Sequence, residues 1–104
     1  MQHPVEISLR GIPASDALER YIGAEADKLA QICDCIGGCL VVAEALQSER
    51  QHVLFGVRLV VTLPGSEFMV NREHRDDVYM ALSDAFAAAA ARLEEYQHRR
   101  KRRG

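Results

Sequence analysis

Residues 76–103 read DDVYMALSDAFAAAAARLEEYQHRRKRR, a stretch that predicts a single long amphipathic helix. Asp76 and Asp77 lie where the helix dipole favours negative charge, and Arg99–Arg103 lie where it favours positive charge. Five consecutive alanines, residues 87–91, are strong helix formers and would let this helix pack closely against a sheet. Apolar side chains recur at steps of three and four and so share one face. They are Tyr79, Leu82, Phe86, Ala89, Ala90, Leu93 and Tyr96.

The residues before this helix supply the strands of a sheet. Alternating apolar residues predict strands near residues 5–9 and 53–63, and a mostly apolar run predicts another at 39–46. The turn dipeptide Pro64-Gly65 indicates a hairpin, which places a fourth strand at residues 68–72. Between the first two strands, Ser15 can cap a helix over residues 16–33. The predicted order of elements is β-α-β-β-β-α.

This order predicts an α+β two-layer sandwich with a four-stranded mixed sheet. Short loops join the last three strands and favour an antiparallel meander, while the helix between the first two strands favours a crossover that makes them parallel. Both helices should then cover one face of a sheet in the order 1-2-3-4. The predicted core comprises Leu18, Ile22, Leu29, Phe55, Val57, Leu59, Tyr79, Leu82 and Phe86.

The sheet face without helices is expected to be rich in apolar side chains. Two interpretations remain open: a surface that binds a partner, or an ordinary sheet with scattered exposed aliphatic residues. The residues predicted to face outward are Leu40, Val42, Glu44, Leu46, Leu54, Arg58, Val60 and Thr62.

Length and composition indicate one domain, residues 1–104, with no membrane span and no export signal. The odd number of cysteines, Cys33, Cys35 and Cys39, favours a reducing cytoplasm over a disulfide framework. Their spacing lacks the four ligands of a structural zinc site, so we expect no metal and no cofactor. No catalytic constellation is recognisable either, which argues against an enzyme with a small-molecule substrate.

The net charge of −2 conceals a strong asymmetry along the chain. Residues 1–97 carry a charge of −7, whereas the segment Arg99–Arg103 carries +5. Such a run is either a solvated helix end or a nucleic-acid contact, and its position beside an acidic body favours the second interpretation. Tyr79 and Tyr96 could stack on bases, but their place on the apolar helix face favours the core.

Three segments resemble the ribosome hibernation promoting factors, also called ribosome-associated inhibitor A or sigma-54 modulation proteins. They are Ala17–Ile22 (ALERYI), Asp27–Leu29 (DKL) and Asp77–Leu82 (DVYMAL), and the resemblance extends over nearly the whole chain. It implies a fold like that of double-stranded-RNA-binding domains. It also implies a cytoplasmic, stress- or stationary-phase inhibitor of translation that lodges on the small ribosomal subunit, where messenger and transfer RNA would sit.

The resemblance further implies which residues contact ribosomal RNA. Lys28 is retained, Arg92 lies one place from the family position, and residues 98–104 match the basic helix end. The predicted RNA-binding residues are therefore Lys28, Arg92, Arg99, Arg100, Lys101, Arg102 and Arg103. Other positions where the family is usually basic hold Glu25, Glu44, Ala88 and Ala91. An alternative function therefore stays open: a protein-interaction or homodimerisation module that uses the open sheet face.

Overall fold

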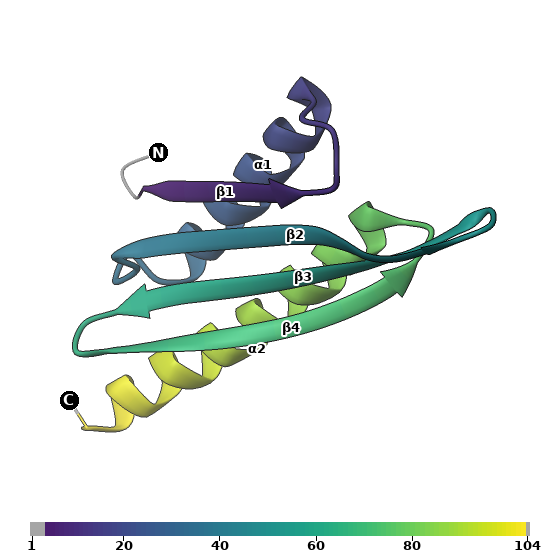
Figure 1. The fold of residues 1–104 in the computed structure, drawn as a ribbon. Coiled ribbons are helices and arrows are strands. Elements are labelled where there is room, and N and C mark those ends of the chain that lie inside the picture. The colour runs from purple at the N-terminus through teal and green to yellow at the C-terminus, as the bar shows by residue number, and fades with distance from the viewer. Residues whose placement is uncertain (1–3, 104) are drawn as a thin grey trace.

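The structure, a computed structural model, describes residues 4–103 and has the predicted order of elements (Figure 1). The strands are β1 (Val5–Arg10), β2 (Gly38–Glu49), β3 (His52–Leu63) and β4 (Ser66–Arg75), and the helices are α1 (Asp16–Ile32) and α2 (Val78–Arg103).

The four strands form one sheet in the order β1-β2-β3-β4. β1 runs parallel to β2, because α1 returns the chain to the starting end of the sheet, and the remaining pairs are antiparallel. Val41 of β2 lies between Ile7 of β1 and Leu59 of β3. Both helices lie behind the same face of the sheet (Figure 1). The predicted α+β two-layer sandwich is confirmed.

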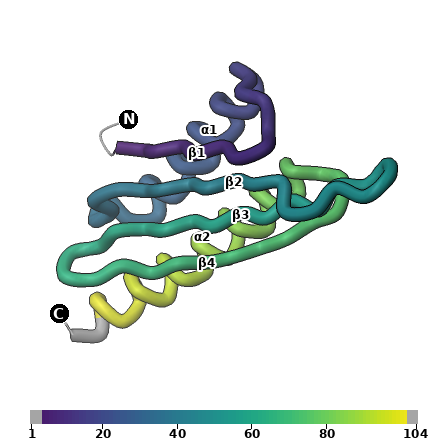
Figure 2. The backbone as a smooth tube through the Cα atoms, in the orientation of Figure 1, coloured from purple at the N-terminus to yellow at the C-terminus, as the bar shows by residue number. Residues whose placement is uncertain are grey.

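The core lies between this sheet face and the two helices. Seven of the predicted core residues are buried, and two predictions were wrong. Phe55 is only half-buried because it pairs with Ala45 and His74 toward the β2–β3 hairpin, which projects past the rest of the sheet (Figure 2). Tyr79 is 39% exposed, because Ala81 and Leu82 take the core face of the first turns of α2. Its ring packs edge-to-face against Tyr21 of α1, with 5.1 Å between the ring centroids.

The hairpin strands are longer than the sequence predicted. β2 continues past Leu46 to Glu49, and β4 covers residues 66–75, because backbone pairing carries both strands through polar sequence. Arg50 makes the tight turn into β3 with a φ of 54°, in the left-handed region. The β2–β3 register also shifts between Ala45 and Gln47, which marks a bulge or irregularity.

The helix starts confirm two predicted roles and correct one. The Ser15 hydroxyl accepts a hydrogen bond from the backbone N–H of Leu18 at 3.1 Å, as an N-cap does. The Asp77 carboxylate accepts from the N–H groups of Tyr79 and Met80 at 3.0 and 3.2 Å, and so caps α2. Asp76 does not open the helix, because its φ of 63° is left-handed.

The cysteines also differ from expectation. Cys33 and Cys35 form a disulfide, with Cα atoms 5.1 Å apart, whereas Cys39 is free and buried. Cys33 ends α1 in an extended conformation, and the turn through Asp34 brings the two sulfur atoms together. Within the part of the chain that the structure describes, no helix is long and apolar enough to cross a membrane. Those residues also contain no group of three metal-ligating side chains.

Candidate nucleic-acid interface

The last two turns of α2 carry the predicted basic helix end beyond the core. Arg99, Arg100 and Lys101 are exposed on a helix that continues to Arg103. Gly104 lies outside the described residues, as do the side chains of Arg102 and Arg103. The helix end is next to the β3–β4 turn, where Ser66, Tyr96, Arg99 and Arg100 line one shallow hollow.

Two contacts fix the direction of this helix end. The Gln97 amide donates a hydrogen bond to the backbone carbonyl of Ile32 at the end of α1, at 3.1 Å. The Arg100 guanidinium donates to Sγ of Cys33, which ends α1, at 4.0 Å, and it also lies over the Tyr96 ring of its own helix, 5.6 Å from the ring centroid. The basic helix end is therefore held against the body rather than projecting as a free tail.

In the part of the chain that the structure describes, Arg99, Arg100 and Lys101 have no acidic partner. Among the side chains that the structure describes, two carboxylates form ion pairs: Glu25 with Lys28, and Asp76 with His52. Neither carboxylate contacts the helix end. Arg99, Arg100 and Lys101 thus present uncompensated positive charge to solvent. Guanidinium and ammonium groups in this state are suited to phosphate oxygens.

Lys28 lies one helical turn before Ile32, on the same end of the molecule as the basic helix end. Its ammonium group is not free, because Nζ donates to Oε2 of Glu25 at 2.8 Å. This hydrogen bond and the charge of Glu25 raise the pKa of Lys28. Glu25 therefore offsets the charge of the neighbouring lysine.

Arg92 lies on the flank of α2 that faces β4. Its guanidinium is 4.8 Å from the centroid of the Phe68 ring, where it covers the edge of the core. Arg92 and Arg99 are seven residues apart, so they share one side of the helix about 10 Å from each other. Ala91 is exposed beside Arg92, and Ala88 is half-buried. Glu44 lies in β2 on the helix-free sheet face.

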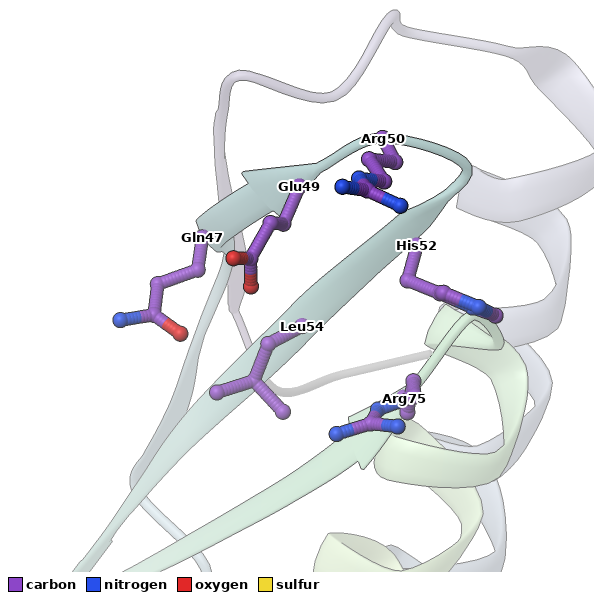
Figure 3. A pocket seen from close by; sticks show the side chains of 6 residues that line it. All are labelled: Gln47, Glu49, Arg50, His52, Leu54 and Arg75. Carbon is purple, nitrogen blue, oxygen red and sulfur yellow. The ribbon is translucent and has the colours of Figure 1, made fainter.

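A second group of basic residues, which the sequence reasoning missed, lies at the end of the β2–β3 hairpin. Arg50 forms the turn, His52 begins β3, and Arg75 ends β4 opposite Leu54. Together they line a hollow of about 190 Å³ (Figure 3). No spacing signal could find this group, because its members come from different strands that meet only through the sheet register.

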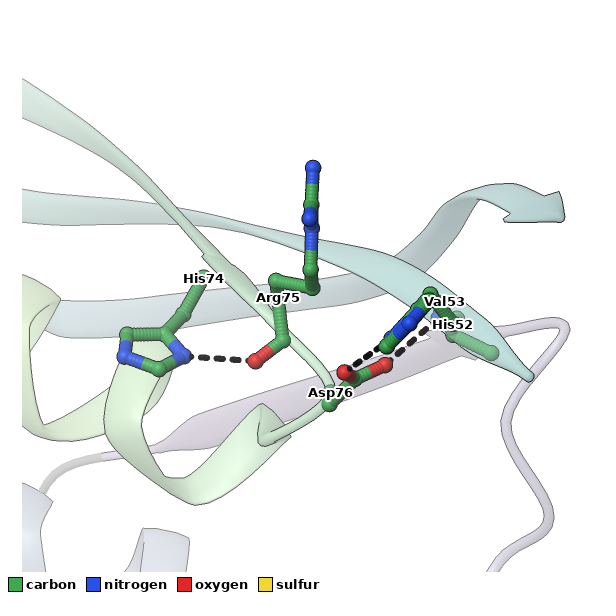
Figure 4. A network of polar contacts seen from close by, with 5 residues as sticks. All are labelled: His52, Val53, His74, Arg75 and Asp76. Atoms are coloured by element: carbon green, nitrogen blue, oxygen red, sulfur yellow. Dashed lines mark hydrogen bonds and ion pairs between the residues drawn. The ribbon is translucent and has the colours of Figure 1, made fainter.

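Asp76 connects the hairpin to the start of α2 (Figure 4). Its carboxylate accepts hydrogen bonds from Nδ1–H of His52 at 2.7 Å and from the backbone N–H of Val53 at 2.8 Å. These two hydrogen bonds stabilise the ionised form and hold the pKa of Asp76 below its usual value. The backbone N–H of Asp76 also donates to the Val53 carbonyl at 2.7 Å, so the connection is reciprocal.

Comparison with known proteins places these features in context. The family described as Sigma 54 modulation protein / S30EA ribosomal protein matches residues 5–101. A solved ribosomal subunit interface protein from Coxiella burnetii superposes with a TM-score of 0.71 at 21% identity, covering 91% of this chain and 98% of that one. The N-terminal domain of Protein Y from Thermus thermophilus gives a TM-score of 0.69 at 18% identity, covering 88% and 94%. These two likenesses show the fold. The sequence matches none of the curated proteins.

Proposed function

Because this chain belongs to the Sigma 54 modulation protein / S30EA ribosomal protein family, we propose that it binds the small ribosomal subunit and inhibits translation. It would act in the cytoplasm by occupancy, without catalysis: the rigid domain fills the decoding region and its basic side chains contact phosphates of ribosomal RNA. The names of the two solved relatives, a ribosomal subunit interface protein and Protein Y, are consistent with this role.

The observation that carries the proposal is the uncompensated charge of the basic helix end. Arg99, Arg100 and Lys101 are exposed and form no ion pair with any carboxylate among the described residues, and the helix beneath them is anchored by Gln97. An anchored cationic surface loses less conformational freedom on binding than a flexible tail does. We propose Arg102 and Arg103 as further phosphate contacts, since they continue the same sequence run.

Lys28 and Arg92 are assigned supporting roles. The carboxylate of Glu25 offsets the charge of Lys28 and so weakens its attraction for phosphate, and the Arg92 guanidinium already lies over the Phe68 ring. The acidic body opposes binding at long range. At physiological ionic strength the Debye length is about 8 Å, so much of that repulsion is screened while direct contacts at the helix end persist.

Ribosome binding across a salt series tests the proposal. If five phosphates are neutralised, the logarithm of affinity should fall against the logarithm of salt concentration with a slope of about −3.5 to −4.5. A chain that ends at Gln97 should lose most of this slope and keep its fold, because residues 98–104 contain no large apolar side chain. Equal slopes for both chains would show that the helix end is merely solvated.

A matched control separates local contacts from net charge. The variant Arg99→Gln/Arg100→Gln/Lys101→Gln removes three charges from the helix end. The control removes three exposed charges elsewhere, at Arg10, Arg20 and Arg58, also by substitution with Gln. The proposal requires the first variant to weaken co-sedimentation with small subunits much more than the control.

A second candidate function, homodimerisation through the open sheet face, has one specific observation in its favour. Leu40, Val60 and Met69 form an apolar row across β2, β3 and β4, and Met69 is 50% exposed. A second copy of this chain could cover that row. Glu6 and Glu67 flank this row, and their carboxylates would oppose its burial in an interface. We therefore rank this function below RNA binding.

A further inference from the structure

The hairpin hollow lies at the opposite end of the molecule from the basic helix end. The protein is 54 Å long and only 22 by 19 Å across. Figure 1 shows the β2–β3 hairpin at one extremity and the end of α2 at the other. Any ligand bound at both ends would have to extend along most of the molecule.

The hollow is built from the strand ends rather than from a loose loop. Its walls are Gln47, Glu49 and Arg50 on one side and Arg75 on the other, with Leu54 between them (Figure 3). Leu54 pairs with both Gln47 and Arg75, so the sheet register sets the distance between the two walls. The volume of about 190 Å³ is several times the roughly 30 Å³ that one water occupies in the liquid, and leaves room for a phosphate group.

The two arginines of the hollow are free to bind an anion. Within residues 4–101, whose side chains the structure describes, no carboxylate forms an ion pair with Arg50 or Arg75. Asp76, the acidic residue that follows Arg75 in the sequence, is already bonded to His52 and Val53, and Figure 4 shows the Arg75 side chain pointing away from it. A guanidinium presents parallel N–H groups that match two oxygens of a phosphate.

Glu49 is the one group in the hollow that opposes an anion. Its carboxylate lies on the same side of the sheet as the two guanidinium groups (Figure 3). Glu49 is exposed to solvent, and exposed side chains change rotamer rapidly, so its carboxylate can move away from a bound anion. Glu49 should therefore weaken anion binding without preventing it, and this gives the test a substitution of opposite sign.

We propose that the hairpin hollow is a second phosphate-binding site for RNA, with Arg50 and Arg75 as its ligands. This inference rests on the proposed function, because the RNA would be the same one that the helix end contacts. The two sites are held at a fixed distance by the rigid domain. They therefore bind most tightly to an RNA whose phosphates are held at the same distance, as in a folded RNA, and less tightly to a short flexible strand.

Binding to purified small ribosomal subunits gives the first test. Arg50→Gln/Arg75→Gln should weaken binding about tenfold and make the salt slope about 0.7 to 0.9 less steep, the loss of one phosphate contact. The matched control, Arg10→Gln/Arg20→Gln, changes the net charge equally at exposed positions outside the hollow. Glu49→Gln should strengthen binding two- to fivefold. If the hairpin variant behaves like the control, the inference is wrong, while loss of binding on truncation at Gln97 would still support the proposed function.

An independent titration keeps the two proposals distinguishable. Inorganic pyrophosphate, added to the full-length protein, should shift the backbone NMR signals of Arg50, His52 and Arg75. The shifts should disappear in Arg50→Gln/Arg75→Gln and persist in the chain that ends at Gln97. Shifts confined to residues of the helix end would overturn the hairpin site, even if the protein binds ribosomes.

Discussion

Phe86→Ala is the substitution that most directly tests the assigned packing of α2. The Phe86 side chain is 3% exposed and belongs to the core from the N-terminal half of the helix. Its helical neighbours on the core face include Ala85 and Ala89, which are too short to fill the space that the ring would leave. Truncation of a buried Phe in a site that cannot collapse costs about 3–5 kcal/mol of unfolding free energy.

Urea and thermal unfolding followed by circular dichroism would measure this loss. For a chain of this length the unfolding entropy converts about 3–5 kcal/mol into a fall in Tm of roughly 14–23 °C. Tyr79→Ala is the matched control, since it removes a similar ring from the same helix. Because Tyr79 is 39% exposed and mainly contacts Tyr21, that variant should lose only about 1–2 kcal/mol. Equal losses in the two variants would refute the assigned helix face.

Three further predictions concern individual groups. Asp76→Ala should destabilise the protein near pH 7. Because the folded-state pKa of Asp76 is lowered, that stabilisation is fully present above the ordinary aspartate pKa of about 4 and is lost as the pH falls through the lowered folded-state pKa, so the urea midpoints of variant and wild type should converge in acid. Burial raises the pKa of Cys39 to about 11, so iodoacetamide at about pH 8.5 should label Cys39 only after unfolding, as peptide mass spectrometry would show. Val60→Glu should abolish any concentration-dependent increase in mass in analytical ultracentrifugation, because a carboxylate would be buried without a partner; an unchanged dimer would remove the open face as the interface.

The sequence predicts the layers of this fold well and its polar ends poorly. Val57, Leu59 and Val61 alternate with exposed or half-buried residues, so one strand and its buried face follow directly from their spacing. The segments Gln47–Glu49 and Glu73–Arg75 resemble loops in composition, yet both are strands. They are held by backbone pairing at the hairpin, which does not require apolar side chains.

The same contrast applies to the candidate site. The cations of Arg99–Arg103 are contiguous, so any helical conformation keeps them together. Arg50 and Arg75 are 25 residues apart and approach one another only because β3 pairs with both neighbouring strands. Asp76 was misassigned for a related reason. An acidic residue before a helix is usually a cap, but here its left-handed backbone turns the carboxylate toward β3.

The topology of the sheet has a consequence for the order of folding. Residues 38–103 form three strands joined by tight turns and a helix that packs on them, so their contacts are mostly local in sequence. β1 and its partner β2 are separated in the chain by the whole of α1, so their parallel pairing closes a much longer loop than a hairpin does. Local contacts form before distant ones because they cost less loop-closure entropy. We expect the hairpins and α2 to form the nucleus, and β1 with α1 to dock last and to open first in hydrogen exchange.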